Sequence, residues 1–522
     1  MPIHSKGTLE MTNPPSPEKI REEISEFLRS RYGEQVAVAD VDLAMPHEGT
    51  ETTKHSSLDQ IDFTLKPTEL EAYLRQYVLH QEEAVEVLAT KICTHFHRRR
   101  WELDHPDRET AAGRIKSNIL MIGPTGVGKT YLVKLIADKL GVPFVKGDAT
   151  KFSETGYVGG DVEDLVRGLV REAHGDMKLA EYGIIYVDEI DKIASSGNLV
   201  GPDVSRTGVQ RALLKLMEDT EVELRTPHDL ASQMEAVIET QRTGKADRKK
   251  VSTRNMLFIV SGAFSGLADI IRRRLTKGTM GFKRGEEIPV RDEDILRRAN
   301  TTDLMEYGFE SEFVGRLPVV AQLGELNEEA LFDVLTNEHS AVTQGKMRDF
   351  AAYGIDLTFD DDALREIARR AYAAGIGARG LQTVMERSLI RFEKLLPTST
   401  VKKLHVTHEL VLEPDRVVND IVAADAVSQF QRKFLEKSGL ILEFPAESAA
   451  WVRENLGGDP ASIVDRLSQM FENYEYGMKL AGTQNLRITP EVLSDPNLFL
   501  DRMIKKVYEE KEHRNAPPLT PP

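Results

Sequence analysis

The segment GPTGVGKT, Gly123–Thr130, constrains the fold of this chain more than any other feature. The apolar run NILMIG precedes it, and KTYLVKLIADKL, whose apolar residues have helical spacing, follows it. In the pattern G-x-x-x-x-G-K-[ST] between a strand and a helix, glycines let backbone amides turn inward around phosphate oxygens, and the helix N-terminus adds partial positive charge. The predicted phosphate-binding loop consists of Gly123, Pro124, Thr125, Gly126, Val127, Gly128, Lys129 and Thr130.

Two adjacent acids end the apolar run in GIIYVDEID. The first of them, Asp188, therefore lies at the carboxyl end of a predicted strand, which is the edge at which α/β sheets bind ligands. We expect Lys129 to reach the β- and γ-phosphates of ATP, and Thr130 and Asp188 to hold Mg²⁺. Glu189 is then suited to orient and deprotonate the attacking water, although an acid here can also serve only as a helix cap.

The order of predicted elements indicates an α/β domain. Helical runs separate five apolar strands, NILMIG, VPFVKGDA, YGIIYVDEID, NMLFIVSGA and LPVVAQL. Strands of this kind, alternating with helices, predict a parallel sheet covered on both faces.

After residue 320 the pattern changes to helices with short strands, which predicts a smaller α+β domain. The segment from Gly354 is echoed from Gly439: each copy has an apolar run ending in Phe, an acidic turn, two helices and a short strand. We interpret the second copy as a degenerate repeat of the small domain, although any strand–helix–helix–strand unit resembles another.

The expected domains are an N-terminal helical and linker region, a large domain, a small domain, an additional C-terminal domain and a disordered tail. Their ranges are 1–65, 66–320, 321–418, 419–510 and 511–522.

Composition narrows the class of protein. The net charge of −16, from 68 Lys and Arg against 84 Asp and Glu, argues against nucleic acid as the main partner. The single cysteine, Cys93, excludes an intrachain disulfide and a zinc site of several cysteines, and is expected to be buried in a helix. That helix should break within HRRRWELDHPDRE, so His95 and His97 should lie at a solvated helix end rather than in a metal site. With no apolar run long enough to span a bilayer, a cytoplasmic protein is expected.

Phosphoryl transfer also needs positive charge on the transferred group. Arg316, in SEFVGRLPVV, and Arg379, in GIGARGLQ, are the candidates. From the residues alone, each can equally be a surface arginine.

A series of blocks occurs in a family-specific order between about residues 65 and 415: YVLHQ, GPTGVGKT, SETGYVGGDVEDLV, IIYVDEIDKIA, GVQRALLKLMED, LFIVSGAF, EFVGRLPVVAQLGELNEEAL and GARGLQTVMER. In these blocks the chain resembles the ClpX family of AAA+ protein unfoldases and, less closely, the HslU family. The resemblance implies a P-loop ATPase domain with a small lid domain, a homo-hexameric ring and ATP hydrolysis coupled to protein unfolding.

The resemblance also assigns roles to single residues. Arg316 would reach the neighbouring subunit's nucleotide, whereas Arg379 would contact that of its own subunit. Tyr77 and Val78 would flank the adenine, and Ser261 would sense the nucleotide state.

In GYVG, the residues Gly156, Tyr157, Val158 and Gly159 resemble the pore loop of these unfoldases. The tyrosine and valine would grip a polypeptide without demanding a particular sequence, and the glycines would let the loop move with the ATP state.

Three departures from the family pattern affect recognition. With one cysteine in all, residues 1–65 cannot form the family's zinc domain. A charged insertion at 222–254 replaces the usual pore-entrance loop. Met280, Gly281 and Phe282 stand where the family has an Ile-Gly-Phe docking loop, which leaves docking of a ClpP-like peptidase open.

In the C-terminal copy Ser462 stands in place of Arg379, so this copy is expected to pack or bind a partner without touching nucleotide.

Two other functions use the same ATPase core. A nucleic-acid motor would need basic pore loops. The pore-loop segment around GYVG and a second candidate loop, DVSRTG, instead carry Glu154, Asp161 and Asp203 against Arg206. An assembly scaffold that uses ATP only to hold a ring together would not need Glu189 or Arg316.

Overall fold

The computed structural model describes residues 57–106, 116–153, 160–195, 204–224, 249–277 and 295–515. The chain divides into two units, residues 1–56 and Ser57–Pro522. The first unit, which holds most of the predicted N-terminal region, lies wholly outside the described residues.

A five-stranded parallel sheet forms the centre of the second unit, with the strand order β2-β3-β6-β1-β7. The strands are β1 (Ile119–Ile122), β2 (Phe144–Asp148), β3 (Ile184–Asp188), β6 (Leu257–Gly262) and β7 (Val319–Gln322). All five strands predicted from the apolar runs are confirmed. In β1 and β6 every residue is buried, because helices cover both faces of the sheet. The boundary expected after residue 320 falls inside β7.

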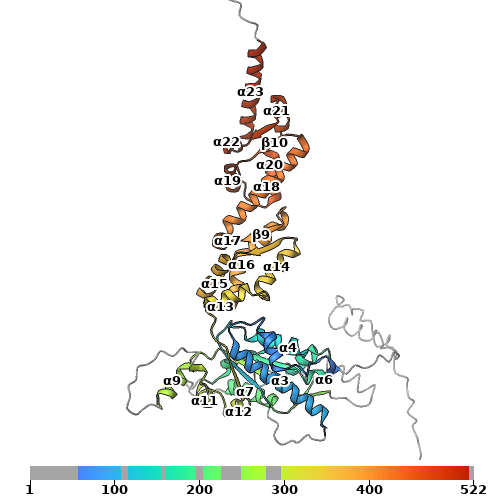
Figure 1. Ribbon diagram of the computed structural model, residues 1–522, viewed down its shortest axis with the longest axis vertical. Helices are drawn as coiled ribbons and strands as arrows, with labels where there is room; N and C mark the ends of the chain where they lie inside the picture. Colours follow the sequence, from blue (N-terminus) through green and yellow to red (C-terminus); the bar gives the residue numbers. More distant parts are fainter. Residues whose placement is uncertain are drawn as a thin grey trace, which may run out of the picture. The chain divides into compact units, whose positions relative to one another are not determined.

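Helices surround this sheet (Figure 1). Helix α3 packs against β7, α4 against β3, and α5 against β2 and β3. The α-helices of this part are α2 (Pro67–Leu74), α3 (Glu82–Asp104), α4 (Lys129–Leu140), α5 (Asp164–Glu172), α6 (Met177–Ala180), α7 (Val204–Met217), α9 (Leu267–Lys277), α11 (Thr301–Tyr307) and α12 (Ser311–Gly315). Short 3₁₀ helices are η1 (Ser57–Gln60), η3 (Ala149–Lys151) and η4 (Ile190–Ile193).

Two predictions at the N-terminal side of the sheet are wrong. Residues 57–65 were assigned to the N-terminal region, but Ile61, Phe63 and Leu65 are buried in the core, and the amide of Asp62 donates to the Leu140 carbonyl over 2.9 Å. Apolar residues alternate along this segment, so it packs on the helices instead of remaining a linker.

Helix α3 continues past Cys93 and ends within the segment that was predicted to break it. It runs to Asp104, with Arg99 and Glu102 and then Arg100 and Asp104 forming ion pairs along its surface. Cys93 is buried as expected, and burial raises the pKa of its thiol to about 11.

His95 is buried rather than solvated. Its Nε2 lies 3.0 Å from the Asn255 carbonyl oxygen, and burial together with the charge of Arg99 lowers its pKa to about 3. The imidazole is therefore a neutral core residue.

The small domain follows the sheet. It contains α13 (Glu328–Thr336), α14 (Ala341–Ala352), β8 (Asp356–Phe359), α15 (Asp361–Ala373), α16 (Ala378–Leu395), η5 (Leu396–Thr398), β9 (Lys403–Val406), α17 (His408–Leu412) and α18 (Pro414–Ser438). Strands β8 and β9 pair in parallel.

The C-terminal elements repeat this order. They are β10 (Ile441–Glu443), α19 (Ala446–Asn455), α20 (Pro460–Met470), α21 (Tyr474–Ala481), β11 (Asn485–Arg487), α22 (Pro490–Ser494) and α23 (Pro496–Asn515). Strands β10 and β11 also pair in parallel, as β8 and β9 do, which supports the internal repeat. Helix α18 contacts elements of both copies and runs through the boundary expected after residue 418 (Figure 1). Helix α23 reaches Asn515, five residues into the segment 511–522 that was predicted to be a tail.

The two ends of the 222–254 insertion form an antiparallel pair of β4 (Glu221–Glu223) and β5 (Lys250–Ser252). Residues 225–248 between them, and the docking candidates Met280, Gly281 and Phe282, lie outside the described residues. In the described parts of the chain, no helix is both long and apolar enough to cross a membrane.

Candidate nucleotide-binding site

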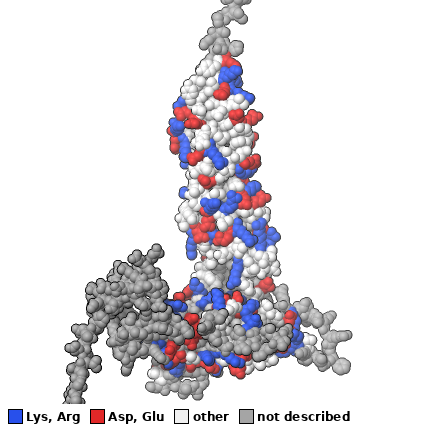
Figure 2. Space-filling model, turned by 180° about the vertical axis from the view of Figure 1, so that it is seen from behind, with Lys and Arg blue, Asp and Glu red and all other residues white. Residues whose placement is uncertain are grey.

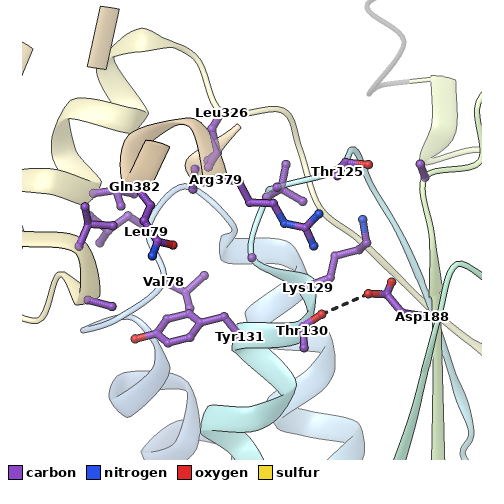
Figure 3. Close-up of a pocket in the computed structure, with 18 of the residues that line it drawn as sticks. Val78, Leu79, Thr125, Lys129, Thr130, Tyr131, Asp188, Leu326, Arg379 and Gln382 are labelled. Carbon is purple, nitrogen blue, oxygen red and sulfur yellow. Dashed lines mark hydrogen bonds between the residues drawn. The ribbon is translucent and has the colours of Figure 1, made fainter. Parts of the chain in front are cut away.

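A cavity of about 400 Å³ opens at the carboxyl edge of the sheet, beside the start of α4. Its walls come from the phosphate loop, the ends of β3 and β6, the segment after α2, and helices α13, α14 and α16 of the small domain (Figure 3). The size and mixed polar and apolar lining fit a nucleotide. Every lining residue lies between Tyr77 and Gln382, so no described residue of the C-terminal repeat takes part.

The phosphate loop depends on glycines at two positions. Gly126 and Gly128 have φ angles of 83° and 94°, a conformation that other residues adopt only with strain. A Cβ added at Gly126 would also come within 2.1 Å of the Ile376 carbonyl oxygen. The amide of Ala378 donates to the Gly126 carbonyl over 2.9 Å, so the loop and the start of α16 form one hydrogen-bonded junction.

Replacing Gly126 with alanine is therefore expected to weaken nucleotide binding about tenfold or more and to lower the melting temperature, since backbone strain of this kind is worth about 1–3 kcal/mol. Binding of a fluorescent nucleotide analogue and thermal unfolding measure the two effects. Gly345→Ala is the matched control, because its added Cβ meets nothing within 4 Å inside α14. Equal nucleotide affinity of Gly126→Ala and the wild type would contradict this account of the loop.

Lys129 folds back onto the loop that precedes it. Its Nζ donates to the carbonyl oxygens of Gly123 and Pro124, each over 2.7 Å. Burial lowers the pKa of this ammonium, while the charge of Asp188 opposes the shift. The side chains of Lys129 and Arg379 both reach into the cavity beside the phosphate loop (Figure 3).

Asp188 lies at the end of β3 with each carboxylate oxygen in use. Oδ1 accepts hydrogen bonds from Ser261 Oγ at 2.7 Å and from the Glu189 amide at 3.1 Å. Oδ2 lies 3.4 Å from Thr130 Oγ1 and 3.0 Å from Lys146 Nζ. Burial disfavours the carboxylate, but the hydrogen bonds from Ser261 and Lys146 outweigh it and lower the pKa of Asp188. Asp188 is thus an oriented carboxylate at neutral pH.

Ser261 does not line the cavity. It is fully buried in β6, and its hydroxyl lies 2.6 Å from that of Tyr186 in addition to its bond with Asp188. Ser261 therefore reaches the cavity wall through its hydrogen bond to Asp188.

Glu189 is exposed and lines the cavity with a backbone φ of 57°. This left-handed conformation is uncommon for a residue with a side chain and is often found at functional sites. Glu189 lies between Asp188, the last residue of β3, and Ile190, the first residue of η4.

The apolar end of the cavity contains the two residues predicted to flank a base. Tyr77 stacks on the ring of His339 at 4.7 Å, and Val78 is almost fully buried. Tyr131, which the sequence analysis missed, lies beside Val78 (Figure 3). Gln382 of α16 also lines the cavity; it lies in the block GARGLQTVMER, but no role was predicted for it.

The two candidate arginines lie at different ends of the sheet: Arg379 beside its carboxyl edge and Arg316 at its amino edge. Arg379 enters the cavity from the first turn of α16 (Figure 3). Arg316 precedes β7 and therefore lies at the amino edge of the parallel sheet, where its carbonyl accepts from the side chain of Asn118 over 3.1 Å. Its Nη2 donates to Glu218 Oε1 over 2.6 Å, and both side chains are about half exposed.

Comparison with known proteins identifies the family. Residues 114–320 match the model of the AAA domain (Cdc48 subfamily), and residues 326–392 match that of the C-terminal, D2-small domain, of ClpB protein. The ATP-dependent Clp protease ATP-binding subunit ClpX 3 of Methylococcus capsulatus is 39% identical over 344 residues, which cover 62% of this chain and 75% of that protein. The chain belongs to the ClpX family. The ClpX subunits of Borrelia duttonii and Treponema denticola are each 37% identical, over 66% and 62% of this chain and 78% and 75% of theirs.

In this ClpX-family chain the predicted pore loop, Gly156, Tyr157, Val158 and Gly159, lies outside the described residues, but its two ends do not. The amide of Ser153 donates to the Gly160 carbonyl over 3.2 Å, and the amide of Gly160 donates to the Lys151 carbonyl over 2.9 Å. Ser153 and Gly160, the described residues on either side of the pore-loop segment, therefore lie side by side directly after η3.

Proposed function

We propose that this chain is an ATP-dependent protein unfoldase of the ClpX kind, which threads polypeptide through the pore of a homo-hexameric ring. The observation that carries the proposal is the single cavity in which the phosphate loop, Asp188, Glu189 and the small-domain Arg379 meet. A ligand that touches both domains through these residues can couple its own hydrolysis to their relative movement.

The donor set of the cavity fits ATP with Mg²⁺. Thr130 Oγ1 and Asp188 Oδ2, a hydroxyl and a carboxylate oxygen 3.4 Å apart, are hard oxygen ligands of the type Mg²⁺ prefers. When bound, Mg²⁺ would neutralise charge on the phosphates and hold their oxygens in place.

The remaining steps belong to side chains of this chain. The amides of the phosphate loop and the N-terminus of α4 bind phosphate oxygens. Lys129 exchanges its two carbonyl partners for the β- and γ-phosphates. Glu189, exposed at the mouth of the cavity, accepts the proton of the attacking water. Tyr77, Val78 and Tyr131 enclose the base.

Arg316 has its role in the neighbouring subunit. It precedes β7, whereas the cavity lies beyond the opposite ends of the strands, about 13 Å away for a four-residue strand. An arginine at that edge, whose guanidinium forms a half-exposed ion pair with Glu218, is suited to complete the site of the next subunit in a ring.

Contacts between short helices support a link from the nucleotide to the pore loop. The loop starts directly after η3, and η3 packs against η4, which begins at the residue after Glu189. The return of the loop is fixed by Arg167, which pairs with Asp161 and with Glu163. A change at Glu189 can thus reach Tyr157 through two adjacent 3₁₀ helices.

Polypeptide is the substrate that fits best. On the face seen in Figure 2, Lys and Arg are interspersed with Asp and Glu over the described surface, and no continuous basic track is visible there. A motor on nucleic acid would need such a track. Delivery of the unfolded chain to a ClpP-like peptidase through Met280, Gly281 and Phe282 is part of the proposal.

The test is unfolding of a fluorescent protein that carries an unstructured tail, with ATP turnover followed in the same samples. We expect the wild type to unfold it, and Tyr157→Ala to hydrolyse ATP at a near-normal rate while its unfolding rate falls tenfold or more, because only the side-chain grip is lost. Tyr476→Ala, which removes a tyrosine that is 72% exposed in α21, should match the wild type in both assays. Unfolding by Tyr157→Ala at the wild-type rate would exclude this grip.

A further inference from the structure

Lys146 contacts both side-chain oxygens that the proposed function assigns to Mg²⁺. It lies on the edge strand β2, and its Nζ is 3.0 Å from Asp188 Oδ2 and 3.3 Å from Thr130 Oγ1. Lys146 belongs neither to the phosphate-loop pattern nor to the segment GIIYVDEID, because it comes from a neighbouring strand.

The Lys146 ammonium and Mg²⁺ would both need the same carboxylate oxygen, Asp188 Oδ2. Asp188 Oδ1 already accepts from Ser261 and from the Glu189 amide, so Oδ2 is the oxygen that faces Thr130. An ammonium nitrogen lies about 3 Å from its acceptor, and a Mg²⁺ ligand lies about 2.1 Å from the ion. An ammonium and a magnesium ion, which repel each other, cannot both lie against Oδ2 and Thr130 Oγ1.

The Lys146 ammonium is able to move away from Asp188 and Thr130. Its side chain is 41% exposed, and its Nζ lies 5.9 Å from the centre of the Tyr186 ring, which offers the ammonium a second, weaker contact. Because the ammonium stays hydrated when it withdraws toward solvent, exchange is not prevented by burial.

We infer that Lys146 and Mg²⁺ compete for Asp188 Oδ2 and Thr130 Oγ1, so that Lys146 sets the Mg²⁺ concentration at which nucleotide binds tightly. This inference rests on the proposed function, because it needs the nucleotide in the cavity. Lys146 keeps the carboxylate in position whenever Mg²⁺ has left, and it raises the Mg²⁺ concentration needed to reload the site.

The experiment measures binding of a fluorescent ADP analogue to the full chain at increasing free Mg²⁺. In Lys146→Met, the Mg²⁺ concentration that gives half of the increase in affinity should fall about fivefold or more, as expected for removal of a partly exposed competing charge. Lys146→Gln, which keeps a polar side chain, should shift it in the same direction and serves if the methionine variant does not fold.

Lys192→Met is the matched control for a general change in the electric field. Lys192 also lines the cavity and is about half exposed, but its ammonium pairs with Asp191 at 3.0 Å and not with Asp188. A shift of less than twofold in this variant supports direct competition. An equal shift in Lys192→Met, or no shift in either Lys146 variant, would overturn the inference. Failure of the wild type to bind the analogue at any Mg²⁺ concentration would instead contradict the proposed function.

Discussion

Replacing Glu189 with glutamine is expected to lower ATP hydrolysis about 100- to 10,000-fold, the usual effect of removing a general base, and to leave nucleotide affinity within about threefold. The amide has the same shape as the carboxylate but cannot accept a proton from water. Affinity should survive because the phosphate loop, Thr130, Asp188 and Arg379 are unchanged. Steady-state phosphate release and binding of a fluorescent nucleotide measure the two properties.

Glu86→Gln is the control for this variant, since Glu86 is exposed on α3 and does not line the cavity. It should hydrolyse ATP as the wild type does. If Glu189→Gln released phosphate at the wild-type rate, the hydrolytic mechanism proposed for this site would fail, and a role of ATP as a mere assembly ligand would be favoured.

Replacing Arg316 with alanine is expected to lower hydrolysis about 1,000-fold or more, the usual contribution of an arginine that reaches the transferred phosphoryl group. Arg316 lies at the amino edge of the sheet and does not line its own cavity, so nucleotide affinity of the isolated subunit should not change. The lost ion pair with Glu218 is half exposed and should contribute little to stability. Phosphate release and thermal unfolding test these expectations.

Mixing two inactive variants separates action in the neighbouring subunit from action within one chain. In rings that contain both Arg316→Ala and Glu189→Gln, some sites combine an intact Glu189 with an intact Arg316 from the next subunit, so partial activity should return. Arg273→Ala, which removes another exposed arginine paired with a glutamate, should stay active throughout. If mixtures remained as inactive as either variant alone, Arg316 would not act across a subunit interface.

Local patterns were sufficient for much of this protein. Continuous apolar runs predicted all five strands of the sheet, because a buried parallel strand needs apolar residues on both faces. The phosphate loop and Asp188 were found for a related reason: their chemistry requires fixed spacing within one strand–turn–helix, and such spacing is visible in the sequence. The small domain was predicted from the change to helices with short strands after residue 320, and the repeated order of the C-terminal elements from the echo of the segment at Gly354 in the segment at Gly439.

Contacts between distant segments were not predictable in this way. The sequence determined that Asp188 ends a strand, but only the pairing of β2 with β3 brings Lys146 to its second oxygen. Helical spacing predicted α3 but not that His95 would be buried against Asn255. The sequence likewise determined that Gly126 turns the phosphate loop, whereas the approach of Ile376 from the small domain, which forbids a Cβ there, arises only when the domains fold together. Spacing along the chain fixes local geometry, while the environment of a side chain depends on which strands and domains become neighbours.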